Sequence, residues 1–145
     1  MINFGPLHTV PDQFRNRLFH SHTNVTTLMR TNVEESIKLA SVMAQRLNQA
    51  RGPVAVLIPR KGFSKYDHEK GPLAMTYDGK PSDRQWYDPI ANEAFIEALR
   101  NELDTGRVKI KVIDAHINDR EFAEEVVRTL LSLSPKKAEP RPPDS

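Results

Sequence analysis

A short apolar run, residues 54–58 (VAVLI), constrains the fold of this chain more than any other feature. The run follows Gly52-Pro53 and is closed by Pro59. Its length and flanking residues predict a strand that is buried on both faces. Residues 33–51, just before it, carry apolar side chains at helical spacing, and Asn32 with Glu35 forms a capping-box pattern. A helix that leads directly into a fully buried strand is typical of α/β proteins.

Two further strands and two further helices are predicted around this core. Residues 25–29 are β-branched and apolar, and residues 108–113 alternate between apolar and lysine positions. Helices are expected to start at Asp88-Pro89 and at Asn118, which has Glu121 three residues later. Because strands and helices alternate, we predict a Rossmann-like three-layer α/β sandwich with a small parallel sheet of three strands.

The chain divides into one domain and a tail. Residues 1–133 have enough apolar side chains for one core, whereas residues 134–145 contain four prolines and no large apolar residue. We therefore expect an α/β lobe over 1–133 and a disordered tail over 134–145. Residues 59–88 lack periodicity but carry aromatic anchors, which favours an ordered loop. Three helices are few for covering both faces of the sheet, so we expect one lobe of a larger protein or half of a homodimer.

Composition excludes several classes of function. The net charge is only +2, from 21 basic and 19 acidic residues, and the two signs are interspersed, which argues against nucleic-acid binding. The sequence has no cysteine and no apolar run near the ~20 residues of a membrane span. Residues 1–4 do not resemble a secretory signal, so a cytoplasmic protein without membrane contact is expected. His20 and His22 lack a third ligand nearby, so no metal site is predicted.

Polar residues follow all three predicted strands. Ligands of parallel α/β sheets bind beyond the carboxyl ends of the strands, and helix N-termini there favour anions. The positive side chains and the glycine at these ends predict a site for a phosphate or a carboxylate. The candidate ligand-binding residues are Arg30, Thr31, Arg60, Lys61, Gly62, Ser64, His116 and Asn118.

Two other interpretations of the same residues stay open. Ser64, Asp67 and His116 are candidates for catalysis on a phosphorylated or carboxylated metabolite, which would make the chain part of an enzyme. Alternatively, the polar residues only cap helices or face solvent, and the domain serves dimerisation or partner binding without a ligand of its own. A hydrogen bond between Ser64 and His116 would favour the enzyme, and a bound anion would argue against the pure interaction module.

Four ordered segments resemble one known family, the tomato mosaic virus resistance protein-like ATP-binding domain proteins, an uncharacterised family. Residues 22–35 are similar to its HNPxVTLMRTxxEE segment, and residues 58–67 to its hPxxGxSxxD segment. Tyr87-Asp88-Pro89 is similar to its helix start, and residues 116–119 match its HIND segment. The resemblance covers about residues 1–133.

The resemblance implies more than the residue patterns do. Family members have two Rossmann-like lobes, and this chain resembles the second, C-terminal lobe only. The start of the chain is similar to an internal family stretch, so we expect a truncated protein. Nucleotide binding is attributed to the first lobe. We therefore expect no cofactor in this lobe, ATP in the N-terminal lobe that is missing here, and that N-terminal lobe as a partner.

Overall fold

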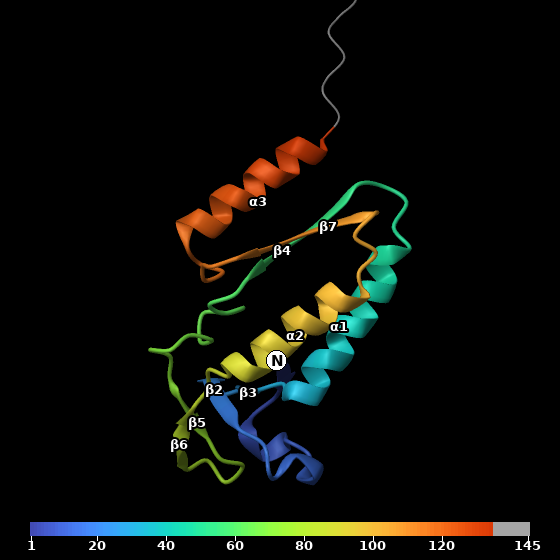
Figure 1. Cartoon of the computed structure of the whole chain (residues 1–145). Helices are drawn as coiled ribbons and strands as arrows, with labels where there is room; N and C mark the ends of the chain where they lie inside the picture. Colours follow the sequence, from blue (N-terminus) through green and yellow to red (C-terminus); the bar gives the residue numbers. More distant parts are fainter. Residues whose placement is uncertain (135–145) are drawn as a thin grey trace, which may run out of the picture.

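The computed structural model describes residues 1–134 as an α/β fold with three helices and two separate sheets (Figure 1). The helices are α1 (Val33–Asn48), α2 (Pro89–Glu102) and α3 (Arg120–Leu133). A parallel two-stranded sheet joins β4 (Val54–Pro59) to β7 (Val108–Ile113). The second sheet is antiparallel and has the strand order β1-β3-β2-β5-β6. Its strands are β1 (Ile2–Phe4), β2 (Phe19–Thr23), β3 (Thr26–Met29), β5 (Leu73–Met75) and β6 (Pro81–Gln85).

The β4–β7 sheet is the middle of three layers, with α1 and α2 on one side and α3 on the other (Figure 1). On β4, Val56 and Ile58 belong to the core cluster that α1 and α2 build, whereas Leu57 packs on the opposite cluster with Phe122 of α3. Successive side chains of a strand point to opposite faces, so an apolar residue at every position needs cover on both. The predicted strand is confirmed and has cover on both faces, although Val54, Ala55 and Leu57 are only partly buried.

The predicted three-stranded parallel sheet is wrong, because β3 does not join β4 and β7. β3 pairs antiparallel with β2, from Phe19↔Met29 to Thr23↔Thr26, and with β1 on its other side. The connection between β2 and β3 is only Asn24-Val25, a hairpin length. β2, which a tight turn connects to β3, pairs with one edge of β3, and β1 pairs with the other edge. Residues 1–24 contain both partner strands, β1 and β2.

The expected helices are present, with changes at their margins. Asn32 and Glu35 form the capping box at the start of α1, and Asp88 caps α2 in front of Pro89. Helix α3 starts one residue later than predicted, so its N-cap is Asp119 and not Asn118. The connection 59–88 is ordered as expected: Trp86 is 1% exposed. It also contains the short strands β5 and β6.

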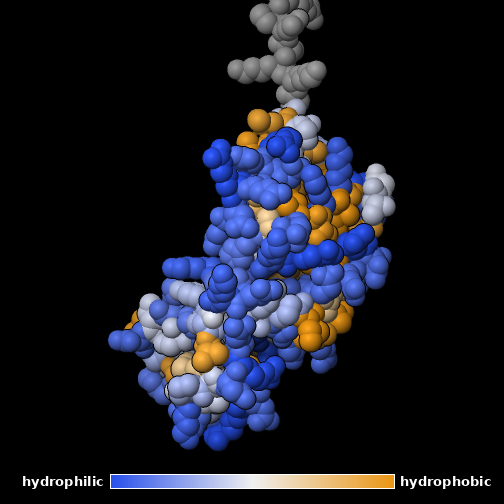
Figure 2. Space-filling view, turned by 60° about the vertical axis from the view of Figure 1, so that its left-hand side comes forward, coloured by the Kyte–Doolittle hydropathy of each residue, from blue (hydrophilic) through white to orange (hydrophobic). Residues whose placement is uncertain are grey.

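Helix α3 leaves most of its apolar side chains uncovered. Phe122 is buried, but Val127, Leu130 and Leu131 are 55%, 62% and 69% exposed. Figure 2 shows apolar side chains gathered in a band on the half of the molecule that carries α3. In the described part of the chain, no helix is long and apolar enough to cross a membrane. The tail prediction for 134–145 falls, beyond Ser134, outside the described residues.

Candidate functional site

The loops that leave β4 and β7 run side by side. Backbone hydrogen bonds continue past the strands, from Arg60 N to Ile113 O (2.9 Å), from Lys61 N to Ala115 O (3.0 Å) and from Ile117 N to Gly62 O (3.1 Å). Parallel strands place both carboxyl ends at the same edge, and these bonds keep the two loops together. Two of the three predicted strand ends therefore meet as expected.

Gly62 holds the first loop in a shape that other residues cannot adopt. Its φ is +141°, and a Cβ there would lie 1.7 Å from the carbonyl oxygen of Asp67 and 2.8 Å from Cδ2 of His116. Glycine adopts such backbone conformations without steric cost. Gly62 thus permits a close approach within the protein, between its own backbone, the Asp67 carbonyl and the His116 ring.

A buried ion pair ties this loop to the antiparallel sheet and to α2. Asp67 is 0% exposed, and its Oδ1 forms a salt bridge with Nη1 of Arg30 at 3.0 Å. Its Oδ2 accepts hydrogen bonds from Phe63 N and from Asn92 Nδ2, both at 2.9 Å. Nη2 of Arg30 donates to Asn92 Oδ1 at 2.6 Å and to Asp88 O at 3.2 Å. The charge of Arg30, predicted to bind a ligand, is therefore neutralised inside the fold.

Both ring nitrogens of His116 are engaged with the backbone. Nδ1 accepts a hydrogen bond from Asn118 N at 3.2 Å, so the proton of the neutral ring is placed on Nε2, which donates to the carbonyl oxygen of Ser64 at 2.9 Å. The hydroxyl of Ser64 is buried and has no partner in the described residues. His116 thus meets the backbone of Ser64 and not its hydroxyl, which is the arrangement that a structural or ligand-positioning histidine adopts.

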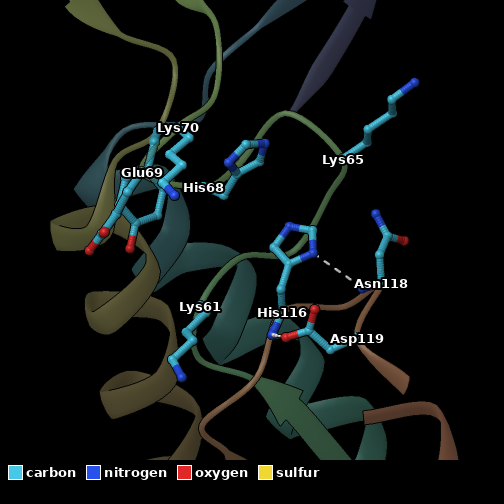
Figure 3. A pocket seen from close by; sticks show the side chains of 9 residues that line it. Lys61, Lys65, His68, Glu69, Lys70, His116, Asn118 and Asp119 are labelled. Atoms are coloured by element: carbon cyan, nitrogen blue, oxygen red, sulfur yellow. Dashed lines mark hydrogen bonds between the residues drawn. The ribbon is translucent and has the colours of Figure 1, made fainter. Parts of the chain in front are cut away.

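A cavity of about 650 Å³ opens beside His116, and we name it the strand-end cavity (Figure 3). It collects side chains from the loop after β4, from the start of α2 and from the start of α3. Three predicted ligand residues line it, together with six others. The lining residues are Lys61, Lys65, His68, Glu69, Lys70, Tyr87, His116, Asn118 and Asp119.

Three lysines and two carboxylates line this cavity, so its net charge is slightly positive. Lys61 lies 3.0 Å from Asp114, and that carboxylate raises the pKa of Lys61. Lys65 and Lys70 are exposed, and neither has an ion-pair partner among residues 1–134. Asp119 accepts a hydrogen bond from His116 N at 2.8 Å, so its carboxylate does not cap α3. The backbone N–H groups of the first turn of α3 keep their attraction for an anion.

Tyr87 and Glu69 add hydrogen-bonding groups to the lysine-lined wall. Burial, and then the charges of Asp67 and Glu69, raise the pKa of Tyr87, so its phenol stays protonated at neutral pH and can donate. The carbonyl oxygen of Glu69 accepts a hydrogen bond from Gln85 Nε2 at 2.7 Å, which fixes the backbone at this position.

The structure places the other predicted site residues outside the cavity lining. Arg60 forms an exposed ion pair with Glu93 at 3.1 Å. Thr31 lines a separate cavity of about 260 Å³, together with Arg17. Gly62 and Ser64 do not line the cavity, but both contact His116, which does.

Lys65, His68 and Lys70 were missed at the sequence level. The available signal was the density of basic residues in 65–70, directly before Gly71-Pro72. His20 and His22 anchor this loop: the His22 ring nitrogen lies 2.7 Å from the Tyr66 hydroxyl, and the His20 ring centre lies 4.4 Å from that of Tyr66.

Comparison with known proteins identifies relatives along nearly the whole chain. Over 137 residues the chain is 39% identical to the ToMV resistance protein Tm-1(GCR237) of Solanum lycopersicum. It is also 33% identical over 136 residues to a UPF0261 protein of Clostridium tetani. Each match covers 94% of this chain, but only 16% of the tomato protein and 30% of the bacterial one.

A family model gives the same result with explicit bounds. Residues 1–134 match the C-terminal domain of an uncharacterised protein family, UPF0261. This match confirms the resemblance seen in the four ordered segments, including its assignment to the C-terminal part. The chain belongs to the uncharacterised protein family UPF0261, and it corresponds to the C-terminal domain of that family.

Proposed function

We propose that this domain binds a small anionic ligand, carrying a phosphate or carboxylate group, in the strand-end cavity. The observation that carries the proposal is that Lys61, Lys65 and Lys70 line one cavity at the carboxyl ends of two parallel strands. Such ends are the usual ligand positions of α/β folds. The start of α3, without a side-chain cap, adds partial positive charge on the same side.

Ligand binding is better supported than catalysis by Ser64 and His116. A serine nucleophile needs a base within hydrogen-bond reach, and here His116 donates to a backbone carbonyl while the serine hydroxyl is buried. Asp67 is inaccessible and paired with Arg30. We therefore infer a recognition role for the domain within a larger family protein, whose ATP site would lie in an N-terminal lobe.

Titration calorimetry with inorganic phosphate tests the proposal. The chain should bind phosphate with measurable heat at low ionic strength, and a double variant, Lys61→Gln with Lys65→Gln, should weaken binding at least about tenfold, since two charge-assisted contacts are lost. Lys109→Gln is the matched control, because Lys109 pairs in register with Ala55 near the opposite end of the sheet. Equal losses in both variants would contradict the proposed site.

The uncovered face of α3 supports a second role, partner binding through self-association. Val126, Val127, Leu130 and Leu131 are between 39% and 69% exposed. Contiguous apolar surface of this kind marks interaction sites. Sedimentation at tens of micromolar should show a dimer for the unchanged chain and a monomer for Leu130→Gln with Leu131→Gln. Ser132→Gln, on the same helix, should leave the dimer intact, and a monomeric parent chain would refute this role.

A further inference from the structure

We infer that the ligand of the strand-end cavity is a phosphate monoester whose organic part carries hydroxyl groups, such as a sugar phosphate. This inference rests on the proposed anion-binding function and narrows it to one class of ligand. It comes from the size of the cavity and from the unequal chemistry of its two sides.

The cavity is too large for a bare anion. Its volume is about 650 Å³, within the usual range for small-molecule sites. Inorganic phosphate has five non-hydrogen atoms and, at about 30 Å³ for each water-sized atom, fills roughly 150 Å³. Most of the cavity would then stay open to water, so it leaves room for a ligand whose organic part is larger than its anionic group.

One side of the cavity suits the phosphate. In the view of Figure 3, Lys65, Asn118 and Asp119 lie to the right of His116, on the α3 side, and Lys61 lies below it to the left. A phosphate ester carries a charge of about −1.5 to −2 at neutral pH, whereas a single carboxylate carries −1. The lysines and the first turn of α3 therefore attract a phosphate ester more strongly than a carboxylate. The imidazole rings of His68 and His116, with centroids 5.7 Å apart, stand between this side and the other one.

The opposite side suits neutral hydroxyl groups. Glu69 and Tyr87 line it, the first as an acceptor and the second as a protonated donor. A second anionic group there would be repelled by Glu69. A cationic group is disfavoured as well, because Lys70 lies beside Glu69 on this side (Figure 3). Hydroxyl groups can both donate to Glu69 and accept from Tyr87, so they match both residues.

Calorimetry with three probes tests the inference on the unmodified chain. Ribose 5-phosphate should bind at least about tenfold more tightly than inorganic phosphate, and ribose alone should give no measurable binding. Glu69→Ala and Tyr87→Phe should each reduce the affinity for ribose 5-phosphate, by about tenfold for Glu69→Ala, and leave the affinity for inorganic phosphate within about twofold. Glu97→Ala, an exposed change on α2 away from the cavity lining, is the control.

Each alternative result has a distinct meaning. Equal affinities for ribose 5-phosphate and inorganic phosphate, or an unchanged ratio in Glu69→Ala, would overturn the sugar-phosphate inference and leave the anion-binding proposal standing. Tighter binding of succinate than of either phosphate would also overturn it. The absence of binding for every anion would overturn both proposals. Circular dichroism of each variant separates lost binding from lost folding.

Discussion

Removing the charge of Asp67 should destabilise the fold more than any other single polar change in this region. The change Asp67→Asn keeps the shape of the side chain, but Oδ2 of Asp67 accepts hydrogen bonds from Phe63 N and Asn92 Nδ2, and Oδ1 makes the ion contact with Nη1 of Arg30. An amide offers one oxygen, so its NH₂ group must face either the two donors or the Arg30 guanidinium. Arg30, only 11% exposed, would then keep a buried charge without a counter-ion.

The expected cost follows from the burial of the pair. Breaking a buried ion pair by removing one partner costs about 3–5 kcal/mol, because the other charge stays uncompensated. Domains of this size are stable by about 5–15 kcal/mol, so the variant should unfold at a much lower urea concentration. The double variant Asp67→Leu with Arg30→Met removes both charges and should recover part of the loss, because no buried charge is then left unpaired, although Phe63 N and Asn92 lose their partners.

Urea unfolding followed by circular dichroism measures these differences. The four members of the cycle are the parent chain, Asp67→Leu, Arg30→Met and the double variant, with Asp67→Asn as the isosteric test. A loss of less than about 1 kcal/mol in the free energy of unfolding for Asp67→Asn would contradict this prediction. So would a double variant whose loss equals the sum of the losses of its two single changes.

Three further predictions concern the same loop and the site. Gly62→Ala should lower the melting temperature strongly, because the Cβ of alanine would overlap the carbonyl oxygen of Asp67. Strained substitutions of this kind cost more than about 2 kcal/mol in the free energy of unfolding, and a drop of less than about 2 °C in calorimetry would contradict the prediction. Arg60→Gln should change phosphate affinity less than about twofold and stability by less than about 1 kcal/mol, since its ion pair with Glu93 is exposed and lies outside the cavity lining. Burial lowers the pKa of His20 below its ordinary value of 6.5, so the unfolded chain binds a proton at this residue more readily than the folded chain does. The contribution of neutral His20 to the free energy of unfolding is complete above pH 6.5 and is lost as the pH falls. His20→Gln should therefore make the urea midpoint less dependent on pH between about pH 7 and 5.5.

Local sequence patterns were sufficient to predict the helices and the central strand. Asn32 and Glu35 predict the start of α1, and Asp88-Pro89 predicts the start of α2. The apolar run 54–58 predicts the central strand, and all three elements are present. These signals are readable because each depends on residues within one or two turns of each other along the chain. The meeting of the β4 and β7 ends followed from the same local patterns together with a general rule of parallel sheets.

The pairing of the strands and the partners of the polar side chains depend on contacts between distant parts of the chain. Nothing in residues 25–29 shows that β3 pairs with β1 and β2 instead of β4. Arg30, predicted for a ligand, meets Asp67 and Asn92, partners 37 and 62 positions away along the chain. Lys65 and Lys70 enter the cavity because the buried Asp67 between them orients their loop. Such contacts depend on groups distant in sequence competing for the same partner, and that competition is settled only when the whole chain packs.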